Sequence, residues 1–217
     1  GFVEWYSHSP ELQALANVLV VAGHVQQDRS GDEEEHFQIG HMHQLITEAQ
    51  LDDKVRWLGK HLDKRLSGEL YRYLADRKSV FIQPALFEAF GLTVIEAMVS
   101  GLPTFATCYG GPLEIIQHGI SGFHIDPNHG EKVVEQFIEF FNQCYRDPDH
   151  WNNISQESIK RIQNRYNWRL YAERLMTLSR IYGFWKYATN LERSETQRYL
   201  EMFYGLMYRP LALQVPH

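Results

Sequence analysis

Cysteine and clustered positive charge are scarce in this sequence, and each scarcity argues against a class of protein. The 217 residues contain two cysteines, Cys108 and Cys144, whose separation fits no metal or disulfide motif. We interpret them as free thiols in a reducing compartment, with a single disulfide as the alternative. The chain is acidic, with a formal net charge of −6, and has no Lys- or Arg-rich run. A nucleic-acid partner is therefore not expected.

A long apolar stretch and an initiating methionine are also absent. No stretch is long enough to cross a bilayer and no signal peptide is evident, so we expect a cytoplasmic protein with no membrane partner. The chain begins at Gly1, within a segment typical of an amphipathic helix. We therefore expect a fragment whose upstream half is missing, with a processed or trimmed polypeptide as the alternative. The hydrophobic content of 44% is sufficient for a packed core.

Short apolar runs alternate with helical patterns over the first 127 residues. The expected strands are residues 17–23, 54–59, 79–83, 103–107 and 121–125, and the expected helices are residues 35–50, 68–75, 92–100 and 113–118. This alternation predicts an α/β fold with a Rossmann-like parallel sheet and helices on both faces. Ligands of such sheets bind beyond the carboxyl ends of the strands.

The pattern changes to helices alone after Pro127. The expected helices are residues 131–145, 151–166, 168–187 and 191–207. We therefore divide the chain into a sheet domain at residues 1–127 and a C-terminal helical extension at residues 128–217. The extension is long for a small domain, so we expect it to pack on that domain and on absent parts or partner subunits. Its aromatic residues suit packing better than base stacking, because the chain is acidic.

Two glutamates, Glu88 and Glu96, flank a predicted strand-to-helix turn. Glu88 is expected in the loop and Glu96 about one turn into the helix that Gly91 opens. Glycine lets a ligand approach the backbone closely, and a helix N-terminus attracts phosphate. Carboxylates there are suited to accept hydrogen bonds from sugar hydroxyls. The pattern predicts a nucleotide-sugar site, with solvated carboxylates near a helix start as the alternative.

Two further loops lie at the same predicted edge of the sheet. The glycine turn at residues 110–112 is either a plain tight turn or a place that leaves room for a ligand or for the first loop. The polar loop at residues 60–67, with His61 and Ser67, either contacts a nucleotide base or is simply solvated.

Metal and hydrolase chemistry have little support in the sequence. His41 and His43 are two positions apart and face different directions on a helix, so we predict no metal site. His118 and His124 are interpreted as structural or surface residues. No nucleophile elbow accompanies the serines or cysteines, so the sequence gives little support to a hydrolase function.

The run from Phe81 to Met98 contains the Glu-x7-Glu motif of retaining glycosyltransferases with the two-domain GT-B architecture, and it resembles the sucrose synthase family. The same resemblance extends over nearly the whole chain, through residues 101–108, 110–112, 114–116, 121–127, 182–187 and 191–204. It implies reversible conversion of sucrose and a nucleoside diphosphate, UDP or ADP, to fructose and UDP-glucose or ADP-glucose. The anomeric configuration is retained, and no cofactor or metal is required.

The resemblance also implies roles for individual residues. Glu88 is the implied catalytic residue and holds the glucose hydroxyls, and Glu96 binds the ribose hydroxyls. Backbone and side-chain donors to the glucose and the diphosphate are implied at Phe90, Gly91, Leu92 and Thr93. The nucleotide-contacting positions of the preceding loop are His61 and Ser67.

Two departures from the family limit these expectations. The loop at residues 60–69 differs from that of the plant enzymes, which puts uracil preference in doubt and suggests a bacterial-type enzyme that accepts ADP. The Arg and Lys that clamp the diphosphate, the first strand of the sheet and the acceptor domain are implied to lie upstream of Gly1. We therefore expect this chain alone to bind nucleotide weakly and not to turn over sucrose.

Two other functions stay open at this point. The near alternative is sucrose-phosphate synthase or another retaining GT-B glycosyltransferase. The alternative of another class is a non-catalytic oligomerisation or assembly fragment, in which the C-terminal helices make the contacts. Because the family is generally tetrameric, a homo-oligomer is expected in either case.

Overall fold

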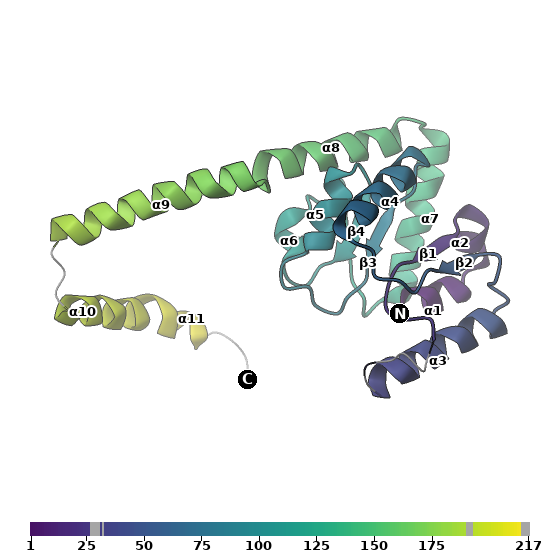
Figure 1. The fold of residues 1–217 in the computed structure, drawn as a ribbon, viewed down its shortest axis with the longest axis horizontal. Coiled ribbons are helices and arrows are strands. Elements are labelled where there is room, and N and C mark those ends of the chain that lie inside the picture. Colours follow the sequence, from purple (N-terminus) through teal and green to yellow (C-terminus); the bar gives the residue numbers. More distant parts are fainter. Residues whose placement is uncertain (27–30, 32, 190–192, 214–217) are drawn as a thin grey trace. The chain divides into compact units, whose positions relative to one another are not determined.

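The computed structural model describes residues 1–26, 31, 33–189 and 193–213, and it divides into two compact units. The first unit is Gly1–Tyr166 and the second is Asn167–His217. Each is described by itself. The expected boundary at residue 127 lies inside the first unit, so the two helices that follow Pro127 belong with the strands (Figure 1).

Every strand expected from the apolar runs is present, and all the strand pairs are parallel. The strands are β1 (Val18–Val20), β2 (Val55–Trp57), β3 (Phe81–Gln83), β4 (Thr104–Thr107) and β5 (Phe123–Ile125). They form two sheets instead of the one that was expected, ordered β1-β2 and β3-β4-β5. Ile82 aligns with Phe105 in the larger sheet, and Val20 aligns with Trp57 in the smaller one.

Eight helices of the first unit are seen in the part of the chain that the structure describes. They are α1 (Phe2–Ser7), α2 (Pro10–Leu15), α3 (Glu33–Glu48), α4 (Lys64–Asp76), α5 (Leu92–Val99), α6 (Pro112–Ile115), α7 (Gly130–Arg146) and α8 (His150–Arg165). Helix α4 begins earlier than the sequence pattern suggested, because the Asp63 carboxylate accepts a hydrogen bond from the Leu66 N–H at 2.8 Å. Ser67 therefore lies in the first turn of a helix, and its prediction as a loop residue is wrong.

The core of the first unit is built around Phe105 of β4, which is fully buried. Its ring stacks on Phe137 of α7 at 4.1 Å and on Phe123 of β5 at 4.6 Å between centroids. The same cluster includes Val55 of β2, and Val18 of β1 packs against it. The two sheets therefore share one hydrophobic core.

Helix α5 is held in place by α8, which packs along it. Val94, Ala97 and Met98 on the inner side of α5 are completely buried. The Ser155 hydroxyl of α8 donates to the Gly101 carbonyl at 2.6 Å, just beyond the end of α5. This buried hydrogen bond fixes where α5 ends and therefore where its N-terminus lies relative to β3.

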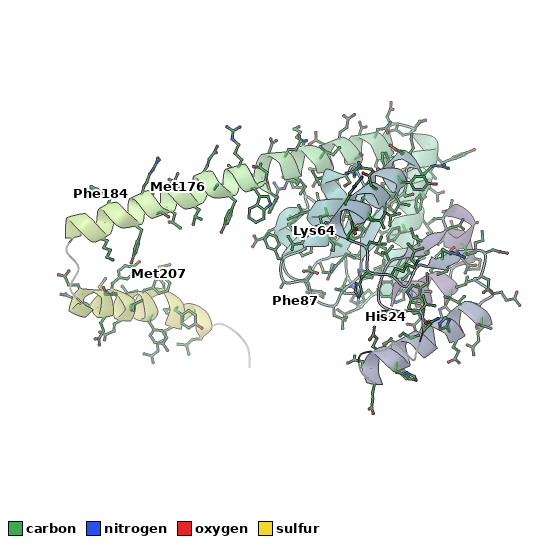
Figure 2. The ribbon with its side chains drawn as sticks, viewed as in Figure 1. His24, Lys64, Phe87, Met176, Phe184 and Met207 are labelled. Atoms are coloured by element: carbon green, nitrogen blue, oxygen red, sulfur yellow. The ribbon has the colours of Figure 1, made fainter. Side chains whose placement is uncertain are left out.

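The second unit contains helices whose described side chains are exposed, apart from the partly buried Leu170. Its elements are α9 (Trp168–Thr189), α10 (Arg193–Phe203), the π-helical segment η2 (Tyr204–Tyr208) and α11 (Arg209–Ala212). The predicted helix at residues 191–207 is confirmed from Arg193, and residues 191–192 lie outside the described part. Figure 2 shows Met176 and Phe184 projecting from α9 and Met207 from η2. No helix among the described residues is both long enough and apolar enough to span a membrane.

Candidate functional site

The loop from Pro84 to Gly91, which joins β3 to α5, packs backbone to backbone against the glycine turn at residues 110–112. The Glu88 N–H donates to the Tyr109 carbonyl at 3.1 Å, and the Gly111 N–H donates to the Glu88 carbonyl at 2.8 Å. A Cβ at Gly110 would collide with the Glu88 carbonyl oxygen, and one at Gly111 would collide with that of Phe90. The two glycines therefore leave room for the Pro84–Gly91 loop, which was one of the alternatives expected for this turn.

The Glu88 carboxylate is held by three donors. Its Oε1 accepts from the backbone N–H of Gly91 at 3.0 Å and of Phe90 at 3.3 Å. Its Oε2 accepts from the Gln83 side-chain amide at 2.9 Å. A carboxylate oxygen has about two lone-pair directions, so Oε2 retains capacity for a further donor such as a hydroxyl. Glu88 is therefore fixed in orientation and can still accept a hydrogen bond.

Gln83 is a site residue that the sequence reasoning missed. It ends β3, and its Oε1 is buried without a hydrogen-bond partner among the described residues. The direction of the amide follows from its contact, since Nε2 and not Oε1 must face the Glu88 carboxylate. A polar residue at the carboxyl end of a predicted strand, directly before Pro84, was the available signal.

Helix α5 begins directly after a glycine in the left-handed conformation. Gly91 has a φ of 98°, a left-handed value that favours glycine. It is buried, and its N–H donates to Glu88 Oε1. The N–H groups of Leu92 and Thr93 lie in the first turn, where an α-helix offers no internal partner. Both side chains are exposed, as is that of Phe90.

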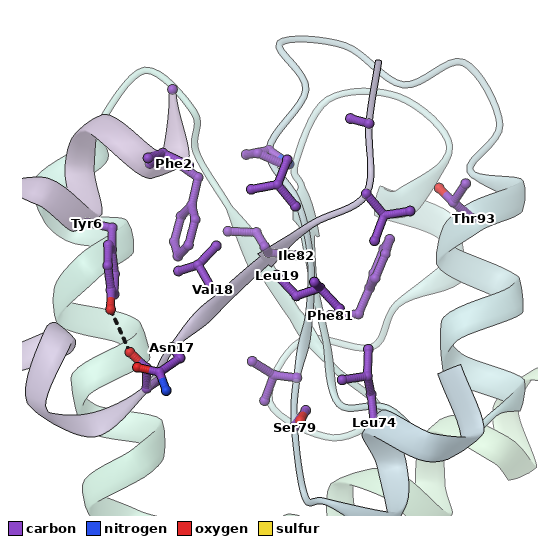
Figure 3. Close-up of a pocket in the computed structure, with 18 of the residues that line it drawn as sticks. Phe2, Tyr6, Asn17, Val18, Leu19, Leu74, Ser79, Phe81, Ile82 and Thr93 are labelled. Atoms are coloured by element: carbon purple, nitrogen blue, oxygen red, sulfur yellow. Dashed lines mark hydrogen bonds between the residues drawn. The ribbon is translucent and has the colours of Figure 1, made fainter. Parts of the chain in front are cut away.

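A cavity of about 770 Å³, here called the large cavity, brings together four of the predicted site residues (Figure 3). They come from the loop before α4, from α4 itself and from α5, and are His61, Ser67, Thr93 and Glu96. Glu88, Phe90, Gly91 and Leu92 lie outside its lining, on the loop and at the start of α5. The predicted site is therefore divided between the large cavity and the adjoining loop.

The polar wall of the large cavity carries interacting groups. Tyr71 of α4 has a raised pKa, first because it is half-buried and second because the Glu96 carboxylate is near enough to oppose its ionisation. The His61 ring meets that of His24 edge to face at 5.9 Å between centroids. Glu96 itself is exposed, so its carboxylate is accessible to hydroxyl donors.

A second polar cluster follows the carboxyl end of β5. The Asp126 carboxylate accepts from the Asn128 N–H at 3.0 Å and contacts His129 Nδ1 at 2.8 Å. These contacts lower the pKa of Asp126 to about 2, the Asn128 backbone N–H being the largest cause. The Tyr109 hydroxyl donates to the same carboxylate at 3.3 Å, which links this cluster to the glycine turn.

His118 and His124 contact each other and the glycine turn, and the two cysteines do not pair. The His124 N–H donates to His118 Nδ1 at 3.0 Å, and the His124 ring contacts the Pro112 carbonyl. Burial lowers the pKa of His124. Cys108 and Cys144 are free thiols, so the single disulfide is not formed. Within the described residues, no group of three or more His, Cys, Asp or Glu side chains is arranged to hold a metal ion.

Comparisons with known proteins show the family to which the chain belongs. A family described as "Glycosyl transferases group 1" matches residues 2–161. The chain is similar to the sucrose synthase of Nitrosomonas europaea, at 59% identity over 217 residues, which are 100% of the chain and 27% of that protein. The chain thus spans about a quarter of the length of the curated relatives that it matches.

Solved structures share the fold. Sucrose-phosphate synthase from Thermosynechococcus elongatus matches with a TM-score of 0.61 and 23% identity over 82% of this chain and 41% of that one. The Anabaena protein HepE in complex with UDP matches with a TM-score of 0.58 and 19% identity, covering 82% of this chain and 56% of that one.

Proposed function

The chain belongs to the glycosyl transferases of group 1, and from that premise we propose that it is the nucleotide-sugar-binding part of a sucrose synthase. The supporting observation is that similarity to sucrose synthases covers the whole chain, including the second unit, whereas the family match ends at residue 161. The proposed activity is that of a retaining hexosyltransferase, and it belongs to the full-length protein.

The proposed reaction exchanges one bond at the anomeric carbon of glucose for another. The bond to the fructose oxygen breaks, a bond to a terminal phosphate oxygen of UDP or ADP forms, and the fructose oxygen takes up the proton that this phosphate gives up. The products are fructose and a nucleotide-glucose of retained configuration. Fixed hydrogen-bond donors near the developing charge, and the alignment of the two substrates, supply the catalysis in this scheme.

The site residues divide this work by position. Glu96, with Thr93, His61 and Ser67 on the wall of the large cavity, would bind the ribose and the base. The first turn of α5 would present N–H groups and a partial positive charge to the diphosphate. Glu88, oriented by Gln83 and by the Gly91 N–H, would accept a hydrogen bond from a glucose hydroxyl through its remaining lone pairs.

Several further properties are part of the proposal. We expect the full-length protein to act in the cytoplasm as a homo-tetramer and to need no metal. Base choice between UDP and ADP depends on the contacts of His61 and Ser67. The 217-residue chain alone is expected to be inactive, because it covers 27% of the Nitrosomonas europaea relative and the resemblance places the diphosphate-clamping cations and the acceptor site elsewhere in the protein.

The experiment that tests the proposal is an assay of the full-length protein with sucrose and either UDP or ADP. We expect nucleotide-glucose with at least one of the two, detected by chromatography. Absence of product with both nucleotides would reject a sucrose synthase and favour the assembly-fragment reading. Fructose and fructose 6-phosphate supplied as competing acceptors in the reverse direction separate the proposal from sucrose-phosphate synthase, whose likeness to this chain is in the fold alone.

A further inference from the structure

Two loops, one after each strand of the smaller sheet, pack against each other beside the large cavity. The first follows β1 through residues 21–26, and the second follows β2 through residues 58–63. A Cβ at Gly59 would collide with Val25, and Gly59 has a φ of 55°, a left-handed value that favours glycine. The second loop can therefore approach the first closely because a glycine stands at this position.

Side chains from β2 and α3 hold the first loop in place. The Trp57 indole N–H donates to the Ala22 carbonyl at 2.7 Å, and His43 Nε2 contacts the Val25 carbonyl at the same distance. The His43 and Trp57 rings also lie against each other, at 5.4 Å between centroids. The backbone on both sides of His24 is thus tied to neighbouring elements, so the fold determines where His24 lies.

His24, which Figure 2 labels, meets His61 where the two loops touch. Their rings are nearly perpendicular, at 86°, with centroids 5.9 Å apart, which is a favoured geometry for aromatic pairs. His61 is exposed and lines the large cavity, whereas His24 is partly buried and lies outside the lining. His24 therefore contacts the cavity-facing ring from outside the cavity and restricts the directions in which that ring can point.

The exposed face of the His61 ring is suited to a nucleobase. It shares the cavity wall with Ser67 and Glu96, where the proposed function places the base and the ribose. A base that stacks on an aromatic side chain binds on the order of 10-fold more tightly for that contact. An exposed side chain loses rotamer freedom when a ligand stacks on it, so a ring that is already held in place binds better than a free one.

We propose that His24 is a positioning residue for the nucleotide base, because its ring holds the His61 imidazole in the orientation on which the base stacks. His24 acts through His61 and does not itself touch the base. The inference rests on the proposed function and deepens it, since the ligand is the nucleoside diphosphate of the large cavity. It assigns a role to a residue that contributes nothing to the cavity lining.

A purely structural role for His24 predicts different behaviour. If the ring only filled space between the two loops, its removal would loosen both loops and weaken the binding of every nucleotide alike. If it orients a stacking surface, the loss depends on the base, because adenine has a larger ring face than uracil. It also disappears when His61 is absent. These two dependences separate a positioning residue from a packing residue.

Calorimetric titration of the full-length protein with ADP and with UDP tests the proposal. We expect His24→Ala to lower the affinity for ADP by about 5- to 10-fold, the effect of losing one such aromatic contact, and the affinity for UDP by less. His24→Phe keeps an aromatic ring against His61 and should remain within about 2-fold of the parent protein. His61→Ala should lose at least as much affinity as His24→Ala.

A double-mutant cycle and an activity assay complete the experiment. Adding His24→Ala to His61→Ala should cause no further loss of affinity, because the first residue acts through the second. In turnover of sucrose, His24→Ala should raise KM for the nucleotide and leave kcat unchanged. His8→Ala is the control, since His8 is exposed and lies outside the cavity lining, and it should match the parent protein in every measurement.

Any of three results would overturn the inference. They are unchanged ADP affinity in His24→Ala, an equal loss for ADP and UDP that His24→Phe does not restore, and a full effect of His24→Ala when His61 is already replaced. Sucrose turnover by the parent protein decides the proposed function separately. Turnover with unchanged affinity in His24→Ala rejects this inference alone, and His24-dependent nucleotide binding without turnover rejects the sucrose synthase reaction alone.

Discussion

Among the described residues, the first unit of this protein buries a cluster of aromatic side chains and the second unit does not. In the first unit Tyr6, Phe105, Phe137 and Phe140 are almost wholly removed from solvent. The Phe105 ring meets those of Phe137 and Phe140, and Phe2 lies between the rings of Phe137 and Tyr6 and contacts both. In the second unit the aromatic side chains that the structure describes are about half or more exposed, from Trp168 at 85% to Phe203 at 48%. Aromatic content alone therefore does not predict a core. The number of other elements that a residue can pack against decides whether it is buried.

The largest expected effect contrasts a buried phenylalanine with an exposed one. Phe105→Ala removes the ring at the centre of the first unit, and we expect it to lower the free energy of unfolding by about 3–5 kcal/mol. Phe184→Ala in the second unit is the matched control, with an expected change within about 0.5 kcal/mol. Denaturant unfolding measures both. Equal losses of unfolding free energy in the two variants would contradict the claim that only the first unit depends on buried aromatic rings.

A glycine substitution is expected to have opposite signs in the two units. Gly110→Ala places a Cβ against the Glu88 carbonyl and strains a backbone with φ of 99°, so we expect a loss of stability of about 2 kcal/mol or more. Gly183→Ala lies in α9 with nothing within 4 Å of the added Cβ, and we expect a gain of about 0.5–1 kcal/mol. Thermal unfolding of each variant is the measurement, and destabilisation by Gly183→Ala would be the contrary result.

The next prediction concerns catalysis and depends on the proposed function. Gln83→Leu removes the amide that orients Glu88 Oε2, and we expect kcat of the full-length enzyme to fall about 10-fold with KM for the nucleotide unchanged. Gln143→Leu, which removes an amide–carboxylate contact on the exposed side of α7, is the control and is expected to be neutral. Unchanged kcat in Gln83→Leu would show that Gln83 does not position the site.

The smallest expected effect is a pH dependence at Asp126. The pKa of this carboxyl falls from 3.8 to about 2 in the folded protein, so the unfolded chain binds its proton more readily. Its stabilising contribution is therefore complete above about pH 4 and is lost as the pH falls through about 2. Asp126→Asn should unfold at a slightly lower temperature than the parent at pH 6 and at the same temperature near pH 2. A difference that is constant with pH would contradict the assignment.

The sequence predicted most of the secondary structure, because local patterns determine it. Apolar runs located β1 to β5, and the glycine-then-proline signal at residues 101–103 marked the end of α5. The early start of α4 was missed because a single side chain, Asp63, caps it. The division into two sheets and the place of α7 and α8 in the first unit depend on contacts between distant residues, which local patterns do not contain.

The sequence predicted which residues belong to the candidate site better than it predicted their contacts with one another. The motif identified Glu88 and Glu96, but no spacing rule shows that Glu88 caps α5 or that Gln83 holds its carboxylate. The role of Gly110 and Gly111 was left open, because a glycine that admits a ligand and one that admits a neighbouring loop have the same sequence. The close approach of the Glu88 and Phe90 carbonyl oxygens to these glycines shows that they admit the neighbouring loop.

The central claim, that the nucleotide site lies in the first unit at Glu96, is tested most directly by calorimetric titration of the full-length protein with its nucleoside diphosphate. Glu96→Ala removes the acceptor for the ribose hydroxyls, and loss of hydrogen bonds to a charged group worth about 1.5–3 kcal/mol predicts affinity lower by about 10- to 100-fold. Glu201→Ala, at an exposed glutamate of α10 in the second unit, is the control and should leave the affinity unchanged. Unchanged affinity in Glu96→Ala would contradict the account.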